Sequence, residues 1–547
     1  MKLIVKYLKY SWWFVSKYKH RIIVIFFLDI LNAVVVLYSP MVYAELISAI
    51  AAINRISIKK YLLISIAVQL LSVLLGQIKG RIENSTIRNA TIDTRKKLQE
   101  QIFSIPPDMM KNFDQGMLFS LLTNDSASPI SFIFTLKNAC FNICTLLGIG
   151  IIIFFISWQM ALITLSVYPI IYIINKLTGK LIRKEQELLV KDTDATTGFL
   201  KDILVSINFI KRNNGQKKVN EKFCSSLNII NEKGKKLEKI KFNNSAFIGT
   251  IGVISYIAIN IIGVFLIVTE KLLFSEFVAF SGYSSKFTKS LDTIVSLNTS
   301  LQPIFVSFGR LEKITDSYKN YEKTKDSLLH INTEISTIKV NDLSICLSDK
   351  QIFHDINVYV KNGECVNFSG KNGSGKTTLL KVLMKEYNNY KGDIFINGTN
   401  LRELDYKDIQ LHFSYLQQNS ELLPLTLYDN ITLFDTDRHI GKNDVIKACK
   451  KVGLWDDIAN LPNGLDTVKT DNFNLSSGQL QKLQFVRALL KKSDVILIDE
   501  ITANLDVESV DIILNLSEQL KKEGKIIFYV SHSHNAEYFI DKKIKME

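Results

Sequence analysis

Residues 370–377 read GKNGSGKT, and this stretch decides how the C-terminal part of the chain folds. It fits the pattern G-x-x-x-x-G-K-[ST], follows the apolar run ECVNFS and precedes the helical run TLLKVLMK. A strand, a glycine-rich loop and a helix in this order cradle phosphate oxygens, because glycine lets backbone N–H groups turn inward beside the helix N-terminus. The pattern predicts that Lys376 reaches the β- and γ-phosphates of a nucleotide and that Thr377 binds Mg²⁺.

A second acidic motif, LIDE at residues 497–500, ends an apolar run that reads as a buried strand. In a nucleotide site, Asp499 would orient Mg²⁺ and its waters, and Glu500 would polarise the attacking water. The runs IFHDINVYVKNGECVNFSG, DVILIDE and KIIFYVSH predict a strand–turn–strand unit and two buried parallel strands. The region from about residue 336 onward is therefore expected to be an α/β nucleotide-binding domain.

The short motif LSSGQ at residues 475–479 identifies the family that this region resembles. With the phosphate loop, LIDE and VSH in this order, the region resembles an ATP-binding cassette. The resemblance implies that Gln418 contacts Mg²⁺ and senses the membrane domain, that Asp506 links two nucleotide sites, and that His532 lies beside the γ-phosphate. It also implies that LSSGQ covers the γ-phosphate of ATP bound to a partner subunit.

The expected nucleotide site combines the loop pattern with the resemblance. Its catalytic residues are Lys376, Glu500 and His532, and its Mg²⁺ ligands are Thr377, Gln418 and Asp499. The expected ATP-binding residues are Gly370, Lys371, Asn372, Gly373, Ser374, Gly375, Lys376, Thr377, Thr378, Gln418, Leu475, Ser476, Ser477, Gly478, Gln479, Asp499, Asp506 and Leu347.

Two departures from the family pattern affect these expectations. Leu347 stands where the family usually places an aromatic residue that stacks on adenine, which predicts weaker or less base-selective adenine binding. The acidic, glycine-containing loop that usually precedes LSSGQ is replaced by TVKTDNFN. Communication with the partner's loop is therefore expected to differ.

The composition of the chain predicts a membrane protein. A chain of 547 residues is too long for a single hydrophobic core, so two or more domains are expected. The chain is 47% hydrophobic and has a formal net charge of +14. Residues 1–320 hold 39 Lys and Arg against 21 Asp and Glu, so the positive excess lies entirely in the apolar half. Basic segments between apolar runs are typical of cytoplasmic loops, and no nucleic-acid motif accompanies the charge. A nucleic-acid partner is therefore not expected.

Six apolar stretches are candidates to span a bilayer, which takes about 20 residues each. An even number of spans with long basic connections places both termini in the cytoplasm. Residues 1–20 intersperse lysines with Tyr, Trp and Phe, which predicts a helix in the membrane interface rather than a signal peptide. The candidate spans are residues 21–44, 61–79, 141–158, 160–177, 246–268 and 272–297.

This half resembles one half of an exporter of the multidrug and peptide type. The expected organisation is an interfacial elbow helix at 1–20, a transmembrane domain at 21–315, a charged flexible linker at 316–335 and the cassette at 336–547. The two long connections between spans would turn back near residues 113–123 and 207–215. In this resemblance the turns press into the cassettes and carry motion to the spans.

Asp29 is a lone carboxylate inside the first expected span, where insertion costs about 2.5–3.5 kcal/mol. It could face a substrate cavity and meet a cationic substrate, or pair with Lys286 or Lys289. The alternative is a hydrated position near the cytoplasmic interface.

These features predict ATP-driven export by alternating access across the cell membrane, with ATP and Mg²⁺ as the cofactors. The partners are a second half-transporter, with a homodimer favoured and a heterodimer open, and the lipid bilayer. A small, perhaps antimicrobial, peptide is the leading substrate. A lipid or hydrophobic drug is the alternative, and a non-transporting ATP-driven membrane regulator is a third hypothesis.

Overall fold

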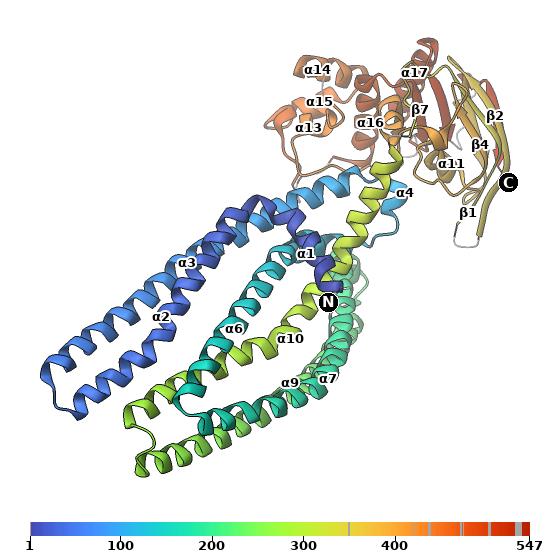
Figure 1. The fold of residues 1–547 in the computed structure, drawn as a ribbon. Coiled ribbons are helices and arrows are strands. Elements are labelled where there is room, and N and C mark those ends of the chain that lie inside the picture. Colours follow the sequence, from blue (N-terminus) through green and yellow to red (C-terminus); the bar gives the residue numbers. More distant parts are fainter. Residues whose placement is uncertain are drawn as a thin grey trace. The chain divides into compact units, whose positions relative to one another are not determined.

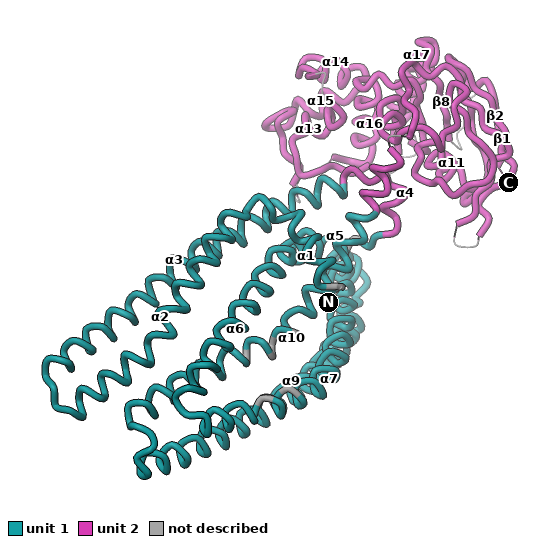
Figure 2. The backbone as a smooth tube through the Cα atoms, viewed as in Figure 1, with its two compact units in different colours: residues 1–102, 113–316 teal, residues 103–112, 317–547 magenta. Residues whose placement is uncertain are grey.

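The structure, a computed structural model, describes residues 2–546 apart from 326, 348–349, 418–419, 436–438, 471–472, 474, 502–504 and 531–538. The chain divides into two compact units (Figure 2). The helical unit comprises residues 1–102 and 113–316, and the cassette unit comprises residues 103–112 and 317–547.

The helical unit consists of long helices joined by short connections (Figure 1). Two of its helices, α3 and α10, continue into the cassette unit. Its elements are α1 (Lys2–Val15), the 3₁₀ turn Ser16–Tyr18, α2 (Lys19–Ala51), α3 (Arg55–Ser104), α5 (Gln115–Thr123), the 3₁₀ turn Asp125–Ala127, α6 (Ser128–Ile156), α7 (Trp158–Val205), α8 (Ile207–Arg212), α9 (Gln216–Val268) and α10 (Phe274–Lys325).

Five of the described helices are long and apolar enough to cross a membrane: α2, α3, α6, α7 and α9. The sixth expected span, residues 272–297, falls mostly within α10, which is not among the helices that meet this criterion in the described part of the chain, so six spans stay a prediction. Helix α3 continues to Ser104, two residues before Pro106, as its uninterrupted helix-forming sequence predicts.

The first helix packs along α6 and α10 within the helical unit. The Tyr7 ring stacks on Phe308 with 4.5 Å between centroids, and the Lys6 ammonium lies 2.8 Å from the Glu312 carboxylate. Trp12 and Trp13 stay exposed. Exposed tryptophans beside lysines are typical of a helix at a membrane interface, and that location stays a prediction.

The expected flexible linker is not a separate segment in its first part. Helix α10 runs on to Lys325, and the boundary between the two units falls inside this helix, after Asp316. The segment is charged but contains neither glycine nor proline, and Lys and Glu are good helix formers. Tyr321 is also buried in the cassette unit, where its hydroxyl donates to Asp405 Oδ1 at 3.0 Å.

The cassette unit contains two sheets with helices packed against them. The first sheet is antiparallel, in the order β2-β1-β4-β5, and the second is parallel, in the order β6-β7-β8-β3-β9. The strands are β1 (Thr337–Leu347), β2 (Lys350–Lys361), β3 (Cys365–Gly370), β4 (Lys391–Ile396), β5 (Thr399–Asn400), β6 (Phe413–Leu416), β7 (Val495–Asp499), β8 (Ile526–Val530) and β9 (Lys542–Met546).

The predicted strand–turn–strand unit and the two buried parallel strands are confirmed. Every residue of β7 and β8 is buried, and the two strands pair in parallel from Val495 to Asp499. Apolar clusters lie on both faces of the parallel sheet. The helices of this unit are α4 (Pro107–Met110), α11 (Lys376–Leu383), α12 (Tyr406–His412), α13 (Leu427–Ile431), α14 (Lys442–Lys451), α15 (Trp455–Ala459), α16 (Ser477–Lys491) and α17 (Val507–Lys522).

Candidate nucleotide site

The glycine-rich loop lies between β3 and α11, as the sequence pattern predicts. Gly375 has φ +87° and precedes the first residue of α11. A Cβ atom on Gly375 would lie 2.7 Å from Ile352 Cγ2 and 2.8 Å from Phe353 Cδ1, so only glycine fits there. Because the first backbone N–H groups of a helix have no partner inside it, the start of α11 offers donors to an anion.

The side chain of Lys376, the first residue of α11, folds back over the glycine-rich loop. Lys376 is 6% exposed, and its Nζ donates to the carbonyl oxygens of Gly370 at 2.9 Å and Lys371 at 3.0 Å. These neutral acceptors hold the ammonium in place without neutralising its charge. The ammonium is therefore available to a phosphate that enters the loop.

The acidic residue at the end of β7 meets the first turn of α11. Asp499 is 4% exposed, and it accepts hydrogen bonds from Thr377 Oγ1 at 3.1 Å and from the Tyr415 hydroxyl at 3.0 Å. Burial raises the pKa of the Asp499 carboxyl, while the two hydroxyls oppose this shift. Thr377 and Asp499, both predicted from sequence as Mg²⁺ ligands, are thus brought together.

The Thr377–Asp499 pair fits Mg²⁺. Both residues offer hard oxygen ligands, and Mg²⁺ usually binds one or two protein oxygens together with substrate phosphates and water. Among the described residues, no three His, Cys, Asp or Glu side chains gather into a metal site of their own. Such a cluster is not needed for a Mg²⁺ ion that enters with a nucleotide.

Tyr415 was missed by the sequence reasoning. It lies on β6, which pairs with β7 in parallel, and Tyr415 is opposite Leu497 in that register. Burial, followed by the nearby Asp499 carboxylate, raises the pKa of the Tyr415 phenol, so the residue stays a hydrogen-bond donor to Asp499. The available signal was its position on a short strand just before Gln418, but the pairing with β7 depends on the tertiary fold.

Glu500 directly follows β7 and has an unusual backbone conformation. Its φ is +49°, a left-handed value that is uncommon for a residue other than glycine, and its N–H donates to Val530 O at 2.9 Å. Strained backbone of this kind clusters at functional sites. Glu500 is the next residue after Asp499, so it lies at the carboxyl end of the parallel strands, which is where ligands bind in open α/β folds.

The LSSGQ stretch forms the start of α16. Ser476 is the N-cap, and its side chain accepts from the Gln479 N–H at 3.2 Å while Gln479 Oε1 accepts from the Ser476 N–H at 2.9 Å. Leu475 is buried, whereas Ser476 and Ser477 are exposed. This capping box fixes a helix start on the surface, with free N–H groups suited to a phosphate.

The segment before Gln418 is tied to α16. The Gln484 side chain accepts from the Gln417 N–H at 2.6 Å and donates to the Gln417 carbonyl at 2.8 Å. Gln418 itself and His532, two of the expected site residues, lie outside the described residues. Their roles stay predictions.

Asp506 and Leu347 have local structural partners. Asp506 is the N-cap of α17 and accepts from the Ser509 N–H at 2.7 Å. Its hydrogen bonds from Ser509 hold the pKa of the Asp506 carboxyl below its usual value. Leu347 ends β1 opposite Lys350 and packs partly against the core of the unit. Both residues therefore have roles in folding besides the roles expected in nucleotide binding.

A segment distant in sequence packs within the cassette unit close to α11. Helix α4 lies in the segment 103–112, where Asp108 Oδ1 accepts from the Asn388 N–H at 3.2 Å. The Lys111 ammonium donates to Glu386 O at 2.6 Å and lies 2.9 Å from the centroid of the Tyr387 ring. Since α11 ends at Leu383, this contact begins only three residues beyond the helix that carries Lys376.

The predicted turn at 113–123 directly follows this segment, and most of it forms α5 (Gln115–Thr123) in the helical unit. Contact of this turn with a cassette stays a prediction. Pro106 and Pro107 stop α3 and start α4. The second expected turn, around α8, belongs to the helical unit.

Asp29 is buried in the helical unit and has partners other than those predicted. Its two oxygens lie 2.6 Å from Lys79 Nζ and 2.7 Å from Lys137 Nζ. Asp29 is only 3% exposed, which excludes the hydrated position, and neither Lys286 nor Lys289 supplies these contacts. Two lysines around one carboxylate leave the cluster with one net positive charge, so it does not suit a cationic substrate.

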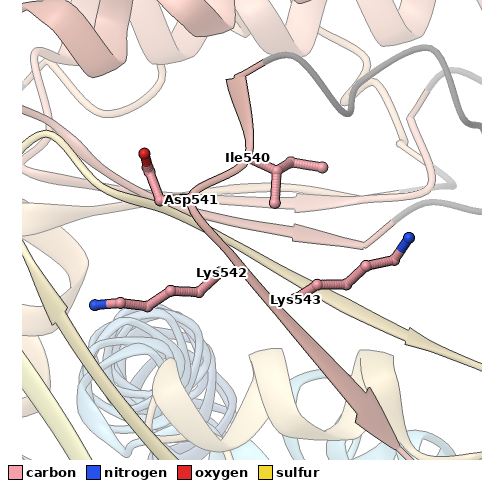
Figure 3. A pocket seen from close by; sticks show the side chains of 4 residues that line it. All are labelled: Ile540, Asp541, Lys542 and Lys543. Carbon is pink, nitrogen blue, oxygen red and sulfur yellow. The ribbon is translucent and has the colours of Figure 1, made fainter.

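Two cavities differ in character. The one shown in Figure 3, of about 190 Å³, is lined by Ile540, Asp541, Lys542 and Lys543 at the start of β9. The Asp541 carboxylate there accepts from the Cys365 N–H at 2.7 Å and pairs with Lys521, so it stabilises the fold. Met546, at the other end of β9, pairs with Gly370, so this cavity lies at the opposite end of the strand from the phosphate loop.

The second cavity, of about 370 Å³, lies in the helical unit and is apolar. It is lined by residues of α6, α7 and α10: Leu146, Leu147, Gly150, Ile151, Phe154, Phe155, Leu165 and Phe287.

Comparisons with known proteins match both units. The family model described as the ABC transporter transmembrane region matches residues 22–291, and the one described as ABC transporter matches residues 353–503. The ATP-dependent lipid A-core flippase of Francisella tularensis subsp. holarctica is 25% identical, over 83% of this chain and 75% of the relative. The flippase of the same name from Photorhabdus laumondii is 24% identical, over 84% of this chain and 79% of the relative.

A solved structure agrees with the fold. The structure of a bacterial Atm1-family ABC exporter with ATP bound has a TM-score of 0.82, covers 97% of this chain and 94% of its own, and is 16% identical. At this identity the likeness supports the fold alone.

Proposed function

The chain belongs to the ABC transporter family, with the transmembrane region and the ATP-binding region on one polypeptide, and we propose that it exports a lipid-like amphipathic molecule. ATP hydrolysis drives the transport. The observation that carries the proposed substrate class is the match, over 83% of the chain, to proteins named lipid A-core flippase. The expected peptide substrate has no support among these relatives, and the alternative expectation of a lipid substrate fits better.

The apolar cavity of the helical unit supports a substrate with hydrocarbon chains. Its lining contains only aliphatic and aromatic side chains and one glycine, and its volume is in the range of small-molecule sites. A peptide with polar backbone groups would leave those groups without partners in such a lining.

The charged cluster on the same unit supports an anionic headgroup. Lys137 lies on α6, as do Leu146 and Phe155 of the cavity lining. At 1.5 Å per residue, the cavity residues of α6 lie about 14–27 Å along the helix from Lys137. A molecule with a negative head and long apolar chains matches the net positive charge and the apolar lining at this spacing.

The residues of the nucleotide site define the proposed hydrolytic step. Bound ATP and Mg²⁺ supply the reacting phosphate and part of the charge that stabilises its transfer. Lys376 would bind the β- and γ-phosphates, and Thr377 and Asp499 would hold the metal at the carboxyl end of β7. Glu500 orients the attacking water and accepts its proton.

The exposed start of α16 supports a two-chain assembly. In this proposal the N–H groups of Ser477 and Gly478 contact the γ-phosphate of ATP held by the other chain, so that two nucleotides join two cassettes. Moving a two-state balance from 1:99 to 99:1 takes about 5.5 kcal/mol of differential binding. Nucleotide held between two chains is the proposed source of that energy, and a homodimer needs no residue beyond those in this chain.

Transport in vesicles tests the proposal. The purified chain is reconstituted with fluorescent analogues of an anionic lipid, a zwitterionic lipid and a hydrophobic peptide, and ATP-dependent movement across the bilayer is measured. We expect the anionic lipid to move and to stimulate ATP hydrolysis most. Movement of the peptide alone would overturn the lipid proposal, and ATP hydrolysis without movement of any probe would overturn export. Lys376→Met, which cannot bind the phosphates, is the inactive control.

A further inference from the structure

Helix α2 contains a proline in its interior, and this proline leaves a backbone group without its usual partner. Pro40 has no N–H, so the Val36 carbonyl, four residues earlier, cannot accept the normal helical hydrogen bond. The helix nevertheless runs from Lys19 to Ala51, and Pro40 is buried within the helical unit. A proline inside a membrane helix is tolerated when neighbouring groups satisfy the carbonyls that it frees.

Helix α10 supplies both donors. The Lys286 ammonium donates to the Val36 carbonyl, and the Tyr283 hydroxyl donates to the Leu37 carbonyl at 2.6 Å. Tyr283 is fully buried. Residues three apart lie on the same face of a helix, so one face of α10 delivers both donors to neighbouring carbonyls of α2.

A glycine on the same face of α10 allows the close approach. A Cβ atom on Gly282 would lie 3.2 Å from Pro40 Cβ and 3.5 Å from Pro40 Cγ, which is tighter than most side-chain contacts. Gly282, Tyr283 and Lys286 therefore match the proline in shape as well as in hydrogen bonding. Packing of small residues is a common way for membrane helices to approach each other.

The arrangement satisfies two costly groups at once. A carbonyl without a donor and an ammonium without water are each unfavourable in a lipid environment. Lys286 does not share the Asp29 carboxylate, whose two oxygens are bonded to Lys79 and Lys137. Its contact with Val36 therefore gives it a role different from that of the charged cluster.

We propose that Lys286 and Tyr283 are positioning residues that hold α2 against α10 during transport: Lys286 caps the Val36 carbonyl freed by Pro40, and Tyr283 adds a hydrogen bond to the neighbouring Leu37 carbonyl. Separation of the two helices leaves the Val36 carbonyl, the Tyr283 hydroxyl and the Lys286 ammonium without these partners. The contact thus favours the arrangement in which α2 and α10 touch. Its role in transport depends on the proposed export, whereas the contact itself is a property of the helices.

A double-mutant cycle in the full-length protein, reconstituted in lipid nanodiscs, tests the proposal. Pro40→Ala restores an N–H that bonds to the Val36 carbonyl inside α2, so Lys286 is no longer needed there. We expect Lys286→Met to lower the unfolding midpoint in the chain with Pro40 and to have little effect in the chain with Pro40→Ala. The interaction energy that such a cycle measures between contacting residues is commonly 0.5–3 kcal/mol, which is roughly a 2- to 150-fold change in the folding equilibrium.

The control separates this role from simple packing. Lys289→Met removes an exposed lysine one turn along α10 and is expected to have the same small effect in both backgrounds. Lys286→Arg, which keeps a donor and a charge, is expected to restore most of the midpoint. Equal losses from Lys286→Met with and without Pro40 would mean that the lysine only packs, and the proposal would be overturned.

A distance measurement gives a readout that is independent of stability. Spin labels at Val34→Cys on α2 and Thr288→Cys on α10, in a background with the native cysteines replaced by serine, report the separation of the two helices. We expect Lys286→Met to shift the distribution of label distances to longer values. In the double variant Pro40→Ala with Lys286→Met, the distribution is expected to return to that of the protein with native Pro40 and Lys286. An unchanged distribution would contradict the proposal, whereas a wild-type protein that moves no lipid would contradict the proposed function and leave this contact standing.

Discussion

The cassette unit and the helical unit assemble their important polar residues in different ways. In the cassette, Lys376 and Thr377 are neighbours at the start of α11, Asp499 and Glu500 are neighbours at the end of β7, and each pair is part of a contiguous motif. In the helical unit, the cluster of Asp29, Lys79 and Lys137 draws one residue from each of three helices. A site that depends on a tight backbone geometry produces a recognisable motif of adjacent residues in the sequence. Charge pairing between long helices produces no such motif.

The largest predicted effect tests the local motifs. Glu500→Gln keeps the shape of the side chain but removes the proposed base, so ATP turnover is expected to fall by about 10²- to 10⁴-fold. The rate of ATP hydrolysis in reconstituted vesicles measures this fall, and the variant is expected to retain bound ATP. The matched control is Glu508→Gln, an exposed acid on α17 that is expected to leave turnover unchanged. Turnover within twofold of the wild type would remove Glu500 from the mechanism.

The second prediction tests the dispersed cluster. Asp29→Leu leaves two lysines without their shared carboxylate, and breaking a buried pair typically costs about 3–5 kcal/mol. The expected result is a lower yield of folded protein and a lower thermal midpoint in detergent. Removing a lysine as well, in Asp29→Leu with Lys137→Met, should recover part of the loss. If the single variant is as stable as the wild type, the cluster does not hold the three helices together.

The third prediction concerns the segment that packs beside α11. Asp108→Ala removes the acceptor of the Asn388 N–H, and an unpaired polar group costs about 1–3 kcal/mol. We expect basal ATP hydrolysis to persist and its stimulation by transported lipid to weaken, because the segment links α3 to the end of α11. The control is Glu322→Ala, an exposed acid on α10. Full stimulation in Asp108→Ala would show that this contact carries no signal.

The smallest effect is a pH dependence within the cassette. Burial lowers the pKa of Lys385 to about 8, and it lowers the pKa of Lys491 to about 8 as well. Between about pH 8 and pH 10.5 the unfolded chain holds protons that the folded unit has lost, so these groups make the free energy of unfolding rise with pH, by at most about 1.4 kcal/mol per pH unit for each group.

Chemical unfolding between pH 8 and 10 measures this slope. Lys385→Met is expected to reduce the rise, because it removes one of the two buried amines, and exposed Lys450→Met is the control. An identical slope in Lys385→Met would show that Lys385 titrates normally in the folded protein.

Much of the cassette could be predicted from its sequence. The phosphate loop and the strands β3, β7 and β8 follow from glycine positions and apolar runs, both of which act over a few residues. Tyr415 could not be predicted, because its bond to Asp499 depends on the pairing of β6 with β7. The packing of segment 103–112 in the cassette unit could not be predicted for a similar reason, since its partners lie about 280 residues along the chain.

The sequence by itself determined the long apolar helices, the phosphate loop and the order of the two regions, because backbone propensity, hydrophobic burial and glycine geometry act locally. The tertiary structure alone decided that Asp29 pairs with Lys79 and Lys137, that Lys286 caps the carbonyl freed by Pro40, and that 103–112 packs in the cassette unit. Each of these contacts joins groups far apart in the chain. Which buried donor meets which acceptor depends on how the helices pack, and no short stretch of residues encodes that choice.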